Sequence, residues 1–94
     1  MDYLNLKLLE PTLSRALAAT GRRVVLDLER TAFLDPAAFA LVLEARHLAR
    51  DLGVALVVVR PRTELWRILR ATGADEELPL RSSLDEALSA LAAT

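Results

Sequence analysis

The chain has 94 residues, of which 53% are hydrophobic, 12 are basic and 13 are acidic, so its formal net charge is −1. A chain of this length builds one core, so we expect a single domain over residues 1–94, and the near-neutral charge argues against binding to nucleic acid. Because cysteine is absent and no apolar run approaches the roughly 20 residues of a bilayer span, we expect a cytoplasmic protein without disulfides, signal peptide or membrane span.

The first segment allows two interpretations. Leucines at alternate positions of residues 3–8 have the period of a β-strand, although several of them also fit a helical stripe. Pro11 favours a helix over residues 10–20, because proline is tolerated in the first helical turn but costs about 3 kcal/mol inside a helix. Residues 3–8 are then predicted to form a short strand or an extended arm.

A strand and the clearest helix of the chain follow. Val24–Leu28 is apolar on both faces apart from Asp27, which is typical of a strand covered on both sides. Asp35 is a favourable N-cap and Pro36 suits the first helical position, so we predict a helix over residues 36–52 that ends at a glycine. Its predicted inward stripe consists of Ala38, Leu41, Val42, Ala45, Leu48, Ala49 and Leu52.

The second half of the chain continues the alternation of strands and helices. Val54–Val59 is a further apolar strand, so the strand, helix and strand form a parallel, right-handed βαβ unit. A helix over 63–72 should pack on the sheet, and the proline in 78–80 confines any strand there to an edge. A capping box opens a helix over 84–92. We therefore predict an α/β fold with a small, mostly parallel sheet of three to four strands and about four helices.

The order of these elements, together with several short strings, resembles the STAS domain, the fold shared by anti-sigma factor antagonists and the cytoplasmic tails of sulphate transporters. The matching strings are VVLDLERTAFLD, DLGVALVVVRP, LRATGADEELPL and SLDEAL. The resemblance implies a non-enzymatic, bacterial protein-interaction module that regulates transcription by partner switching. Its implied partner is an anti-sigma factor of the kinase type, and no cofactor is implied.

Two departures from the family pattern affect the expected function. In phosphorylatable members, the Asp at the helix start is followed by Ser-Ser-Gly, and the second hydroxyl residue accepts phosphate from the partner kinase. Here Asp35 is followed by Pro36, Ala37 and Ala38, so Ala37 occupies the acceptor position and no phosphorylation is expected there. The usual N-terminal β-hairpin is also lacking. Either the sheet is smaller, or residues 3–8 supply a substitute strand, or a second copy covers the gap in a homodimer.

The loop 30–35 and the first half of the following helix are the predicted contact surface. Phe39, Leu43, Arg46 and Arg50 fall on one line beside the buried stripe, and aromatic and arginine side chains are frequent anchors of interfaces. Alternatively, Phe39 and Leu43 pack at the side of the core. The predicted partner-binding residues are Asp35, Pro36, Ala37, Ala38, Phe39, Leu43 and Arg46.

Other chemistry receives little support from the sequence. His47 is the single histidine and no cysteine accompanies it, so we expect no metal site. We interpret Asp35 as an N-cap and not as a phospho-acceptor, because no acidic pair for Mg²⁺ accompanies it. Four arginines between positions 60 and 70 suggest a mixed solvated face, and Trp66 either covers the edge of the core or belongs to a self-association surface.

Two alternatives to the antagonist function remain. The chain also resembles the STAS subunit of lipid-transport ABC systems, which binds its ATPase through a similar face. A small nucleotide-binding or enzymatic domain is the weaker alternative, because the three glycines each lie near a predicted helix end and form no phosphate-binding loop.

Overall fold

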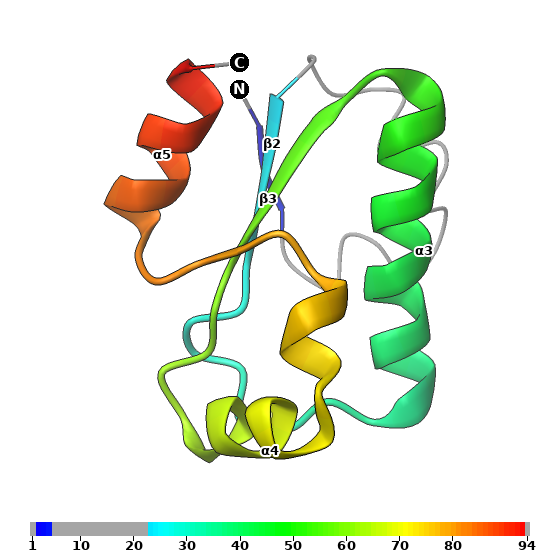
Figure 1. The fold of residues 1–94 in the computed structure, drawn as a ribbon, viewed down its shortest axis with the longest axis vertical. Helices are drawn as coiled ribbons and strands as arrows, with labels where there is room; N and C mark the ends of the chain where they lie inside the picture. The colour runs from blue at the N-terminus through cyan, green and yellow to red at the C-terminus, as the bar shows by residue number, and fades with distance from the viewer. Residues whose placement is uncertain (1, 5–22, 94) are drawn as a thin grey trace.

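A computed structural model of the chain describes residues 2–4 and 23–93 (Figure 1). The helix predicted over 10–20 and most of the segment 3–8 lie outside these residues. The described residues form a four-stranded sheet in the order β1-β2-β3-β4, and every neighbouring pair of strands is parallel. The predicted α/β class and parallel sheet are thus confirmed.

The two central strands are those that the sequence indicated most clearly. They are β2 (Arg23–Asp27) and β3 (Ala55–Val59), each within one residue of its predicted bounds. At one edge, β1 (Asp2–Leu4) pairs with β2, which confirms a short strand near the beginning of the chain. At the other edge lies β4 (Leu80–Arg81), which follows Pro79 as expected for a strand near a proline.

Apolar residues on both faces of the central strands divide the core into two layers. On one face, Leu26 and Val58 pack with Val42 of the helix α3 (Pro36–Leu52). On the opposite face, Val25 and Val57 pack with residues of the C-terminal helix α5 (Leu84–Ala92). Because side chains alternate along a strand, a sheet covered on both faces requires the continuous apolar runs seen in the sequence.

The helix α3 (Pro36–Leu52) begins and ends where its caps predict. The Asp35 Oδ1 atom accepts a hydrogen bond from the Ala38 N–H at 2.7 Å, which satisfies one of the free donors of the first turn. At the other end, Gly53 has a φ of 71°, a left-handed conformation that glycine adopts without steric cost. One residue of the predicted inward stripe is wrong, because Leu52 in the last turn is 46% exposed.

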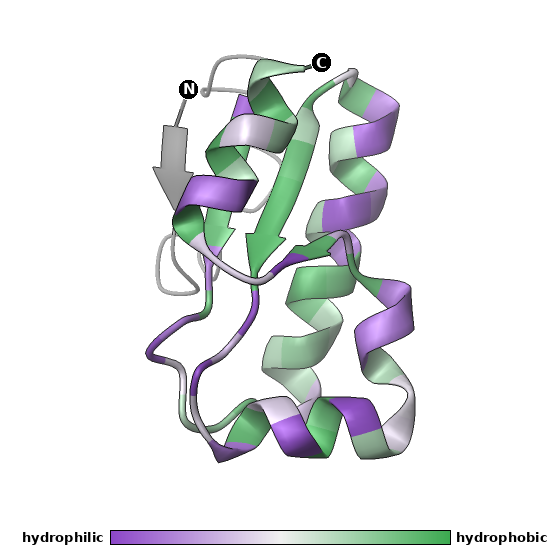
Figure 2. Cartoon of the chain, turned by 60° about the vertical axis from the view of Figure 1, so that its left-hand side comes forward, coloured by the Kyte–Doolittle hydropathy of each residue, from purple (hydrophilic) through white to green (hydrophobic). Residues whose placement is uncertain are grey.

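The remaining helices are α4 (Glu64–Thr72), the 3₁₀ turn η1 (Ala74–Glu77) and α5 (Leu84–Ala92). In Figures 1 and 2, α4 lies across the end of the molecule where β2 and β3 finish, instead of along a face of the sheet. The prediction that α4 packs on the sheet is therefore wrong. The short connection after β3 is held by a hydrogen bond from Arg62 N–H to the Glu29 carbonyl, which keeps the start of α4 at this end.

Candidate functional site

The candidate site is the loop between β2 and α3 together with the first turns of α3. As β2 ends, the Asp27 Oδ1 atom accepts a hydrogen bond from the Glu29 N–H at 2.8 Å, and the Thr31 N–H donates to the Leu28 carbonyl at 2.9 Å. These short-range bonds give the chain a turn directly after the strand. The loop therefore leaves the sheet in a defined direction.

A second set of contacts ties this loop to the connection between β3 and α4. The Arg62 N–H donates to the Glu29 carbonyl at 2.9 Å, and the Thr63 Oγ1 atom donates to the Thr31 carbonyl at 2.6 Å. The side chains of Arg62 and Glu29 also approach to 3.7 Å, although such exposed pairs contribute little stability. The two loops consequently form one continuous surface at the end of the sheet.

The start of α3 presents a small and neutral surface. Asp35, Pro36 and Ala37 are exposed, and Ala38 is half-buried. Beyond the Asp35 cap, the first turn of the helix has no acidic residue, and Ala37 has no hydroxyl that could accept a phosphoryl group. A partner that covers this turn would meet methyl and proline groups and would bury few charges.

Phe33 is the residue of this loop that sequence reasoning missed. It is 76% exposed, the highest value among the exposed large hydrophobic residues of the described chain. The sequence contained an indirect signal for it. Leu34 and Phe39 occupy the N′ and N4 positions of a hydrophobic staple around the Asp35 cap, so Phe33 is the apolar residue of the loop that this pair does not include. Both are half-buried. Phe33 lies outside that pair and next to it, and it faces the solvent.

The residues predicted further along α3 have contacts of their own. Phe39 and Leu43 are half-buried and pack against the core layer between α3 and the sheet. Packing at the side of the core was the alternative to a contact surface in the sequence analysis, and it leaves part of each side chain exposed. The Arg46 Nη1 atom donates a hydrogen bond to the Glu77 carbonyl, which links α3 to η1. Their role in partner binding stays a prediction.

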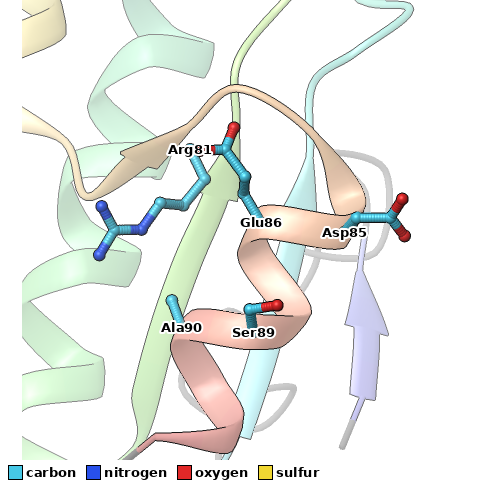
Figure 3. A pocket seen from close by; sticks show the side chains of 5 residues that line it. All are labelled: Arg81, Asp85, Glu86, Ser89 and Ala90. Carbon is cyan, nitrogen blue, oxygen red and sulfur yellow. The ribbon is translucent and has the colours of Figure 1, made fainter.

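A second group of polar residues lines an open hollow of about 460 Å³ between β4 and α5 (Figure 3). The lining residues are Arg81, Asp85, Glu86, Ser89 and Ala90. Figure 3 shows the Asp85 carboxylate pointing away from the hollow, so the two acidic side chains do not converge on one point. Acid–base chemistry by a carboxylate pair requires such convergence, which this hollow does not provide.

Residues 2–4 and 23–93 contain neither a candidate metal site nor a candidate membrane span. Within these ranges no three His, Asp or Glu side chains are placed to hold a metal ion, and His47 is exposed. Over the same ranges, none of the helices combines the length and the apolar character that a bilayer crossing requires.

The fold and the site together define a parallel α/β domain that carries an exposed aromatic loop beside a neutral helix start, an arrangement suited to contact with another protein. The family model of the STAS domain matches residues 1–87, and the chain belongs to this family. No curated protein and no solved structure matches the sequence. STAS domains are generally non-enzymatic interaction modules, and membership indicates a protein-interaction or antagonist-like function.

Proposed function

We propose that this protein is an anti-anti-sigma-factor-like regulator that binds an anti-sigma partner of the kinase type through the loop 28–35 and the start of α3. The observation that carries the proposal is Phe33, which is 76% exposed next to the neutral turn around Ala37. Aromatic anchors of this kind supply much of the energy of protein interfaces. Phe33 supports the proposal because it adjoins a turn of small neutral side chains, where a partner could bury the ring without burying charges.

The same surface explains how this chain differs from its phosphorylatable relatives. A phosphoryl group adds about −1.5 to −2 charges, and it disrupts an interface that has no partner for them. Ala37 keeps the surface in the neutral state that favours binding. We therefore propose a regulator whose binding is not controlled by phosphorylation at position 37.

The substitution Ala37→Asp tests this proposal. It introduces one carboxylate into the proposed interface, and we expect binding to weaken by about tenfold or more, because an unpaired charge would be buried. The fold should be unaffected, since an acidic side chain in the first turn of a helix interacts favourably with the helix dipole. The matched control is Ala93→Asp, which alters another exposed alanine at the end of α5.

The partner is identified first, by affinity purification and mass spectrometry from the source cells, and its affinity for each variant is then measured by calorimetry. Recovery of an anti-sigma kinase supports the proposal, whereas recovery of a transporter ATPase supports the alternative related to lipid-transport ABC systems. Equal affinities of the unaltered protein and the Ala37→Asp variant would remove the start of α3 from the interface.

A further inference from the structure

Trp66 in α4 lies close to two arginine side chains. The Arg60 guanidinium carbon lies 4.8 Å from the centroid of the Trp66 ring, and the corresponding Arg70 distance is 5.9 Å. Both distances fall within the range of cation–π interactions, which hold a guanidinium in place without neutralising its charge. The half-buried Trp66 ring thus orders two positive charges at the end of the molecule.

The neighbouring arginines are paired with carboxylates, but Arg60 and Arg70 are not. Arg62 approaches Glu29, and Arg67 donates to Glu64, which raises the pKa of the Arg67 guanidinium. Over the described ranges 2–4 and 23–93, neither Arg60 nor Arg70 forms an ion pair, and the buried Arg60 Nε atom has no hydrogen-bond partner. These four arginines and two glutamates carry a net charge of +2, and the adjoining η1 adds the acidic residues Asp75, Glu76 and Glu77 at the far end of α4.

Apolar groups adjoin these charges. A hollow of about 370 Å³ is lined by Trp66, Arg67, Arg70 and Ala71. Ile68 is 49% exposed, but it lies two residues after Trp66 and therefore on another side of α4. Figure 2 shows hydrophobic and hydrophilic residues alternating along α4 at this end of the molecule. Tryptophan and arginine side chains around one hollow have the composition of interface centres.

This surface is continuous with the proposed docking loop. The hydrogen bonds from Arg62 N–H to Glu29 and from Thr63 Oγ1 to Thr31 fasten the start of α4 to the loop 28–35. Figures 1 and 2 both place α4 and that loop at the same end of the sheet. One partner can therefore cover both.

We propose that α4 is the second half of the docking surface and that it binds an acidic segment of the same protein partner. Carboxylates of that segment pair with the unpaired guanidiniums of Arg60 and Arg70, since charge-assisted bonds to arginine are among the strongest at interfaces. An apolar side chain of the segment covers Trp66 at the hollow that Arg70 and Ala71 also line. Nucleic acid is a poorer ligand, because a net charge of +2 neutralises few phosphates. The inference rests on the proposed function and specifies the chemistry of its partner.

Photo-crosslinking in the source cells provides the probe. The photoreactive residue p-benzoylphenylalanine replaces Phe33 in one variant of the full chain and the exposed Ala71 in another, and crosslinked peptides are sequenced by mass spectrometry. We expect both positions to capture the same protein, and the peptide captured from Ala71 to be rich in Asp and Glu. The affinity of that protein for Arg70→Glu should fall about tenfold.

The matched control is Arg50→Glu, because Arg50 is also an exposed arginine in the last turn of its helix and lies outside the predicted partner-binding residues. The C-terminal end of α3 and the helix α4 lie at opposite ends of the molecule in Figure 1. It should leave the affinity unchanged. Suppose that Phe33 captures a protein. The inference then fails, while the proposed function stands, if Ala71 captures no protein, if it captures a second copy of this chain, or if it captures a segment without acidic residues. Equal affinities of the captured protein for the Arg70→Glu and Arg50→Glu variants would also overturn the inference. If neither position captures a protein, the proposed function fails as well.

Discussion

Replacing Asp35 with alanine removes the acceptor of the 2.7 Å hydrogen bond from the Ala38 N–H at the start of α3. Loss of an N-cap costs about 1 kcal/mol, and loss of a carboxylate near a helix N-terminus adds roughly 0.3 to 1 kcal/mol. The dipole contribution applies here because the first turn of α3 contains no other acidic residue. We therefore expect Asp35→Ala to lower the free energy of unfolding by about 1 to 2 kcal/mol.

Asp35→Asn separates the two contributions, since it keeps the side-chain oxygen and removes the charge. It should cost roughly 0.5 kcal/mol, which corresponds to the dipole contribution alone. The assay is urea unfolding followed by far-UV circular dichroism and by the fluorescence of Trp66, the single tryptophan of the chain. A loss of 1 kcal/mol should lower Tm by about 4–8 °C in a domain of this size.

The control for the capping argument is Ser83→Ala in α5, where Ser83 Oγ accepts from the Glu86 N–H at 3.1 Å. The first turn of α5 keeps two acidic residues in this variant, so we expect a loss of about 1 kcal/mol without a dipole contribution. An Asp35→Asn variant as unstable as Asp35→Ala would refute the assignment of the hydrogen bond as the main contribution. An unchanged Asp35→Ala variant would show that the cap does not stabilise the fold.

Three further substitutions test other parts of the structure. Thr63→Val removes the hydroxyl that donates to the Thr31 carbonyl and should cost about 0.5–1.5 kcal/mol, with faster amide exchange in the loop 28–35; Thr63→Ser should preserve both values. Gly53→Ala should lower the free energy of unfolding, measured in urea, by about 1 kcal/mol, because φ is 71° at this position. The added Cβ atom would meet no neighbour within 4 Å, so the loss would reflect the backbone conformation alone. Leu26→Ala empties a fully buried site and should cost about 2–5 kcal/mol; a loss below 1 kcal/mol would contradict the packing of β2 between two layers.

The start of α3 shows what local sequence can predict about the site. Asp35, Pro36 and Gly53 fix the two ends of α3 through bonds within a few residues, and these signals do not depend on the rest of the fold. Phe33 was missed because exposure is not a local property. Its neighbours in the staple positions, Leu34 and Phe39, give an indirect signal, but the 76% exposure follows from how the loop leaves β2.

The placement of α4 shows the limit of periodicity. The helical spacing of Leu65, Ile68, Leu69 and Thr72 predicts one buried side of α4. Leu65 and Leu69 are buried, whereas Ile68 is 49% exposed and Thr72 is exposed, so the prediction is right for two of the four residues. It does not indicate what covers that side, and the helix lies across the end of the sheet. The wrong prediction for Leu52 has a similar cause. Leu52 continues the inward stripe of α3, but it occupies the last turn of the helix and is half-exposed.

The sequence by itself determined the strands, the helices and their caps, because these depend on alternation, helical period and side-chain bonds across a few residues. It also determined that position 37 has no hydroxyl. Tertiary structure decided which surfaces stand together. The hydrogen bond from Thr63 Oγ1 to the Thr31 carbonyl joins the docking loop to the start of α4, and the Trp66 ring lies within cation–π distance of both Arg60 and Arg70. Such contacts depend on how the connections bring distant segments to one end of the sheet, which no local pattern encodes.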